Sequence, residues 1–203
     1  MVSRDSDPWQ PDESELENLI EEVPTLVTLR RFAAELDRLA WFKTVGEPLS
    51  PADLAAARAY ADSLGFPDVG IAPVPDWPFA LDCTRHAGWH AAAWEAEEQL
   101  RMALRTELAT RLSDEALAVA LRHVAAVADD ALTAPMSEVA ALWDIRDPAV
   151  LDAAATAAAE ATQCMALAVA AEADPDHAFR HKFRLFVAGR WPIGIVGASF
   201  NLF

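Results

Sequence analysis

Four of the five histidines in this chain form two pairs with the same spacing. His86 and His90 stand four residues apart in the segment HAGWH, and His177 and His181 do so in HAFRH. Four residues is slightly more than one helical turn, so both imidazoles of a pair share a face if the segment is helical. This spacing is typical of metal ligands, and ordinary core or surface histidines also show it.

A shared metal site is one interpretation of the two pairs. Four imidazoles that meet would form a nitrogen-rich site suited to zinc, nickel, copper or iron. A carboxylate from Glu97, Glu172 or Asp176 would make it similar to the metal sites inside helical bundles. The chain has no ExxH or HExxH pattern to support this reading. The alternative is two unrelated pairs, with His86 and His90 in the core and the other two histidines on a partly exposed flank.

A cationic strip follows the second pair. Arg180, Lys182, Arg184 and Arg190 occur there with no acidic residue among them. Arginine binds carboxylate and phosphate through two parallel hydrogen bonds, so the strip indicates an anion or phosphate pocket. The alternatives are neutralisation by the acid-rich segment near the N-terminus, or simple solvation.

The last segment, GRWPIGIVGASFNLF, differs in composition from the rest of the chain. Glycines, β-branched residues and aromatics replace alanine there, and the runs 193–196 and 199–203 could pair as a hairpin through Gly197 and Ala198. Trp191 and Phe200 could line a pocket under this tail, which would then act as a lid or docking segment. The alternative is a clamp that closes the helical bundle.

Helices must position these residues, because helix signals dominate the sequence. Ser50 before Pro51, and Asp147 before Pro148, are typical helix starts. The segment 65–80 contains four prolines and predicts a rigid extended crossing without regular structure. The expected helices cover a short stretch that follows Ser14 and ends near Pro24, then 25–44, 51–65, 83–111, a stretch that begins at 113, 137–143, 147–173 and 176–188.

These elements predict an all-α fold. We expect a single bundle-like domain of about seven helices over residues 13–203, with a short irregular or hairpin C-terminal tail. Residues 1–12, rich in Asp, Pro and Ser, are expected to be disordered.

The charge balance limits the partners. The 203 residues carry 32 acids and 16 Lys and Arg, a formal net charge of −16, which repels nucleic acid phosphates. A basic protein or a small-molecule ligand fits such a surface better. The two cysteines are far apart, no signal peptide is recognisable, and the least charged stretch is too short for a bilayer. The sequence therefore predicts a soluble cytoplasmic protein with no membrane contact.

Three function classes follow from these observations. The first is a helical protein with a histidine-lined site for a transition metal or small ligand, between the helix that starts near Cys83 and the one that starts near Asp176. Its expected ligand-binding residues are Glu97, Arg180, Arg184, Arg190 and Trp191. The second class is an acidic interaction protein that masks a basic partner, as immunity proteins and antitoxins do. The third is a non-catalytic subunit, and no motif shows whether the chain is an enzyme.

Overall fold

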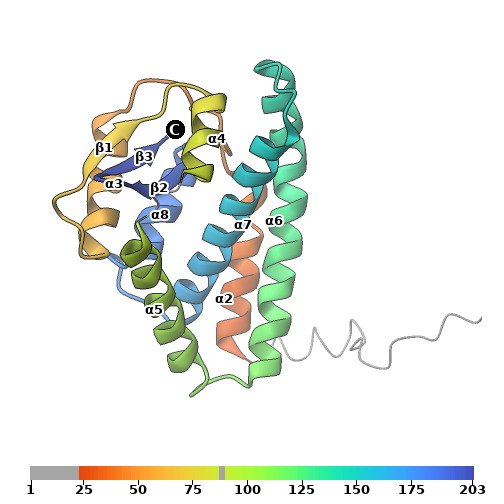
Figure 1. Ribbon diagram of the computed structural model, residues 1–203. Coiled ribbons are helices and arrows are strands. Elements are labelled where there is room, and N and C mark those ends of the chain that lie inside the picture. Colours follow the sequence, from red (N-terminus) through yellow and green to blue (C-terminus); the bar gives the residue numbers. More distant parts are fainter. Residues whose placement is uncertain (1–22, 87–89) are drawn as a thin grey trace, which may run out of the picture.

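A computed structural model describes residues 23–86 and 90–203. This part of the chain forms seven α-helices, one short 3-10 helix and a small three-stranded sheet (Figure 1), which confirms the predicted mostly helical fold with a short β tail. The predicted segments 1–12 and 13–22 lie outside the described residues. The elements are α2 (Pro24–Ala33), η1 (Leu36–Arg38), α3 (Pro51–Ser63), β1 (Gly70–Pro73), α4 (Trp77–Arg85), α5 (Ala91–Leu108), α6 (Asp114–Leu142), α7 (Pro148–Ala170), α8 (Ala178–Val187), β2 (Pro192–Val196) and β3 (Ser199–Leu202).

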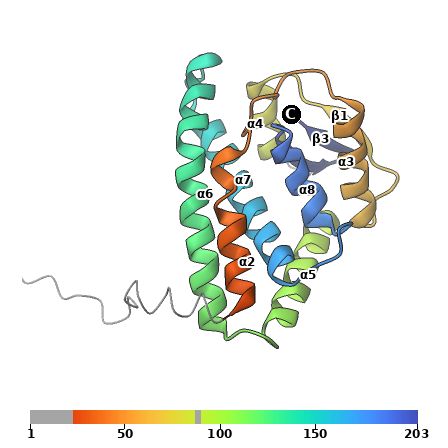
Figure 2. The same ribbon diagram turned by 180° about the vertical axis from the view of Figure 1, so that it is seen from behind.

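Helix α7 is the central element of the bundle. It packs against α2, α4, α5, α6 and α8, and Figures 1 and 2 show α2 beside it on the face opposite α5. Alanines fill its buried side, so neighbouring helices approach closely. By length and composition alone, α7 is the one described helix that could cross a membrane. Its packing against five helices is that of a core helix.

Three helix starts agree with their sequence signals. Ser50 and Asp53 form a capping box at the start of α3, in which the Ser50 hydroxyl accepts from the Asp53 amide and the Asp53 carboxylate accepts from the Ser50 amide. The Ser113 and Asp147 side chains cap α6 and α7 in the same general way. Local chemistry therefore sets these boundaries.

The C-terminal residues pair as the predicted hairpin, with β2 antiparallel to β3. The sheet has the order β1-β3-β2, and β1 pairs parallel to β3 with Gly70 opposite Ser199. The prediction of an irregular crossing over 65–80 is wrong at this point, because 70–73 becomes a strand once β3 is beside it. Helix α4 also begins inside this segment, at Trp77.

The predicted helix over 83–111 is two helices. Helix α4 ends at Arg85, His86 is extended at its C-terminal end, and α5 begins at Ala91 with His90 as its N-cap. The His90 amide donates to the Ile195 carbonyl of β2 (3.1 Å). In a continuous helix this amide would instead donate to a carbonyl of the preceding turn.

Two further helix boundaries differ from prediction. The helix expected over 25–44 ends at Ala33, because the chain turns to bury both Trp41 and Phe42, and Phe42 has a positive φ of 58°. The break expected before Ser137 is absent, and α6 continues through Pro135 for 29 residues. The Thr133 and Ser137 hydroxyls donate to carbonyls one turn earlier in this stretch.

Candidate functional site

The first histidine pair does not share a helix face. His86 lies exposed at the end of α4, whereas His90 caps α5, where its Nδ1 accepts from the Ala93 amide (3.3 Å). The His90 ring packs edge-on against Phe66, with 4.8 Å between ring centroids. The premise of a core pair one helical turn apart is therefore wrong.

The second pair is also used locally. His177 caps α8, and its Nδ1 accepts from the Phe179 amide (3.2 Å). Burial, together with the nearby Arg180 and His181, lowers the pKa of the His177 imidazole. The His181 ring is buried rather than partly exposed, and its Nδ1 accepts from Arg184 Nη1 (3.1 Å), because a guanidinium only donates.

His90 and His177 lie at opposite ends of the contact between α5 and α8, which run antiparallel. Helix α5 starts beside β2 and α8 ends just before it, and Lys182 of α8 meets Glu97 of α5 (Nζ to Oε1, 2.7 Å). His90 lies seven residues before Glu97, and His177 five before Lys182, so the two imidazoles are about 18 Å apart along the helix axes. No three His, Cys, Asp or Glu side chains within 23–86 and 90–203 gather closely enough to hold a metal ion.

The cationic strip does not converge on one pocket. Arg180 Nε donates to the Ala173 carbonyl and Arg184 Nη2 to the Pro175 carbonyl, so both arginines hold the loop between α7 and α8. Lys182 is bound by Glu97. Among the described residues Glu97 therefore neutralises Lys182, while Arg180 and Arg184 bind backbone carbonyls; the acids near the N-terminus lie outside the described residues.

Arg190 is a structural residue at the start of the tail. Its guanidinium is buried and donates through Nε and Nη2 to Asp53 Oδ2 (3.2 and 3.0 Å). Its other donors reach the carbonyls of Thr44, Glu47 and Pro48. All five N–H donors of Arg190 are therefore used, and the tail is fixed to α3 and the loop before it.

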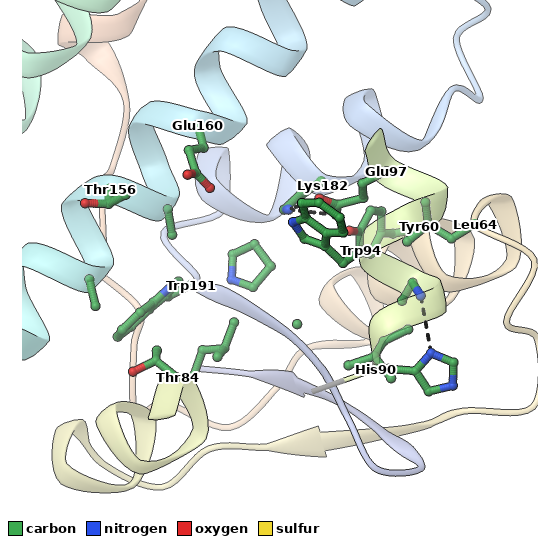
Figure 3. Close-up of a pocket in the computed structure, with 17 residues that line it drawn as sticks. Tyr60, Leu64, Thr84, His90, Trp94, Glu97, Thr156, Glu160, Lys182 and Trp191 are labelled. Carbon is green, nitrogen blue, oxygen red and sulfur yellow. Dashed lines mark hydrogen bonds and ion pairs between the residues drawn. The ribbon is translucent and has the colours of Figure 1, made fainter. Parts of the chain in front are cut away.

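The described residues do form a pocket of about 350 Å³ beside the predicted helix contact. Its walls come from α3, α4, α5, α7, α8 and β2, as Figure 3 shows. Its volume lies at the lower end of the range for small-molecule sites. Of the nine residues predicted for a site, three line it. They are His90, Glu97 and Trp191.

Most of the pocket wall is apolar or aromatic. Tyr60 of α3 and Leu64 are buried, and β2 contributes a run of backbone and apolar side chains from 192 to 195. Trp94 of α5 is 63% exposed, although it lines the same pocket. An exposed tryptophan at the edge of a concave site offers a large ring to anything that enters.

Trp191, which lines the pocket, carries an unusual polar group. Its indole is 1% exposed and packs against Phe42 and Trp77, so the prediction of a clamp describes its packing better than the prediction of a lid. The buried Nε1 has no hydrogen-bond acceptor among the described residues. Buried N–H groups are almost always paired, so this donor calls for an explanation.

Charged groups occupy the side of the pocket between α5 and α7. Lys182 Nζ contacts both Glu97 oxygens (2.7 and 3.0 Å) and lies 5.7 Å from the centre of the Tyr60 ring. Glu160 of α7 also lines the pocket, and Figure 3 shows its carboxylate directed from α7 toward it. Burial raises the pKa of the neighbouring Cys164 thiol to about 11, so this thiol is neutral at pH 7.

Sequence reasoning missed Tyr60, Trp94 and Glu160. Each is an ordinary residue on an amphipathic helix, and no motif connects α3, α5 and α7 in the sequence. The packing of α5 and α8 against α7, and of α3 against α8, brings them together.

Comparison of this chain with protein-family models, with curated proteins and with solved structures finds no match.

Proposed function

We propose that this protein binds a small, largely apolar organic molecule in the pocket between α3, α5, α7, α8 and β2. The single observation that carries the proposal is the Trp191 N–H, which is buried without an acceptor among the described residues and belongs to a side chain that lines a ligand-sized pocket. A ligand carbonyl, ether or hydroxyl oxygen would supply that acceptor. A site with mostly apolar walls and a few fixed polar groups is typical of small-molecule binding.

This is the small-ligand form of the first predicted class. Its metal form has no support, since the two histidine pairs are distant from each other and are used in local contacts. The interaction-protein class, which rests on net charge, stays a prediction, as do the subunit class and a cytoplasmic location.

A nuclear magnetic resonance experiment tests the proposal with an internal control. Trp77 Nε1 is also buried and unpartnered among the described residues, but Trp77 does not line the pocket. Neutral aryl ethers and aryl amides are titrated into uniformly ¹⁵N-labelled protein. We expect the indole N–H signal of Trp191 to move downfield as it gains an acceptor, and that of Trp77 to move much less.

A pair of variants gives the matched control for the site. Ala157→Phe places a ring in the pocket, whereas Ala92→Phe adds the same ring at an exposed position of α5 outside it. The Trp191 response should disappear in the first variant and persist in the second. If no compound in the series moves Trp191 more than Trp77, or if Ala157→Phe responds like the parent protein, the proposal is wrong.

A further inference from the structure

The charges around the pocket select the kind of ligand. This inference rests on the proposed function, because it specifies the ligand of the same pocket. The pocket wall contains two carboxylates, Glu97 and Glu160, and one ammonium, Lys182. Their balance decides whether the site favours an anion or a cation.

Lys182 is not available to an incoming anion. Both Glu97 oxygens accept from its Nζ, and the side chains of the pair are only 21% and 24% exposed. The Tyr60 ring covers a further side of the ammonium. An anion would have to displace a carboxylate that already binds through two contacts, at a cost set by partly buried charges.

Glu160 is the carboxylate left over. It is exposed and makes no hydrogen bond or ion pair with any residue in the described ranges, and Arg101, on which it acts electrostatically, is bound to Glu98 instead. Glu160 acts on Arg101 only as the last and smallest influence on the pKa of that guanidinium. Among the charged residues that line the pocket, Glu160 is thus the one without a partner of opposite charge.

An aromatic ring completes the preference. The exposed Trp94 lies on the α5 side of the pocket and Glu160 on the α7 side (Figure 3). The face of an indole ring attracts a cation, and a carboxylate on the other side of the pocket attracts the same charge. From these contacts we infer that the ligand is an organic amine: its ammonium lies between Glu160 and Trp94, its apolar body fills the pocket, and an oxygen accepts from Trp191 Nε1.

The experiment uses three probes of similar shape that differ in charge. They are 4-methoxyphenethylamine, 4-methoxyphenethyl alcohol and 3-(4-methoxyphenyl)propionate, each with an ether oxygen for Trp191. Dissociation constants come from titrations followed by the Trp191 indole signal. We expect the amine to bind about tenfold more tightly than the alcohol, and the propionate to bind most weakly.

Two charge variants of α7 locate the preference. Glu160→Gln should bring the amine within about twofold of the alcohol and leave the alcohol unchanged, since only the charged contact is lost. Asp152→Asn removes one exposed carboxylate of the same helix outside the pocket, so it should keep the tenfold ratio.

Each other result overturns the inference in a recognisable way. Equal binding of the three probes, or an unchanged ratio in Glu160→Gln, removes the amine preference while the ligand pocket stands. Tightest binding of the propionate would mean that Lys182 leaves Glu97 to receive an anion. If none of the three shifts Trp191 more than Trp77, the proposed pocket function fails together with the inference.

Discussion

Removal of the Asp53 carboxylate should destabilise the protein far more than removal of its capping partner. Asp53 has two roles, because its side chain accepts from the Ser50 amide and from Arg190. Ser50→Ala removes only a helix cap, which costs about 1 kcal/mol. Asp53→Ala also leaves the Arg190 guanidinium buried without its counter-charge, and breaking a buried pair in this way costs about 3–5 kcal/mol.

Urea unfolding followed by circular dichroism at 222 nm measures both costs, provided that the slope of the unfolding free energy against urea concentration is the same in each variant. Arg146→Ala is the surface control, since its partner Asp144 and Arg146 itself are largely exposed, and it should cost about 0–1 kcal/mol. The difference between Asp53→Ala and Ser50→Ala should persist in about 1 M NaCl, because salt screens buried charges poorly.

A double-mutant cycle shows whether the pair accounts for the difference. Arg190→Met combined with Asp53→Ala should cost about 2 kcal/mol less than the sum of the single substitutions, since neither charge is then left alone. The reasoning fails if Asp53→Ala costs no more than about 0.5 kcal/mol beyond Ser50→Ala, or if the cycle shows additivity.

Three further predictions concern single residues. The pKa of His177 is lowered in the folded protein, so the unfolded chain binds more protons than the folded one just below about pH 6.5. The free energy of unfolding should therefore rise with pH up to that point. The variant His177→Asn, which keeps an N-cap acceptor, should flatten this rise, as measured by urea titrations at several pH values. The thiol of Cys164 has a pKa of about 11, so in a Cys83→Ser variant it should react with an aromatic disulfide at pH 8 about 100-fold more slowly than an unburied thiol does. Equal reaction rates of Cys164 in the folded and the unfolded protein would contradict this prediction. Gly189→Ala places a Cβ 2.9 Å from the Ala40 carbonyl oxygen, whereas the Cβ of Gly65→Ala meets nothing within 4 Å at a similar positive φ. Gly189→Ala should therefore lower the free energy of unfolding by about 1–3 kcal/mol more than Gly65→Ala does, as measured by thermal and urea unfolding.

The parts of the fold that local chemistry determines could be predicted from the sequence. Ser50, Ser113 and Asp147 each cap a helix where their residue types indicate, and the C-terminal hairpin forms where β-branched residues flank Gly197. Each of these signals acts over a few neighbouring residues, so no knowledge of distant partners is needed.

Tertiary contacts decided the features that the sequence analysis missed. Apolar spacing continued past Ala33 and across 86–90, yet burial of Trp41 and the hydrogen bond from the His90 amide to β2 ended those helices. The strand at 70–73 exists because β3 lies beside it. Repeated histidine spacing drew attention to α5 and α8, and these helices do border the pocket, but Tyr60, Trp94 and Glu160 reach it only through packing.

The order of the strands has a consequence for the newly made chain. The middle strand of the sheet, β3, is the last of the three to be synthesised. Until it arrives, the backbone groups of β1 at 70–73 have no sheet partner, and such an open edge invites pairing with other chains. A chain whose synthesis pauses before β3 is made therefore keeps an open strand edge, and a chaperone that covers 70–73 during this interval would prevent such pairing.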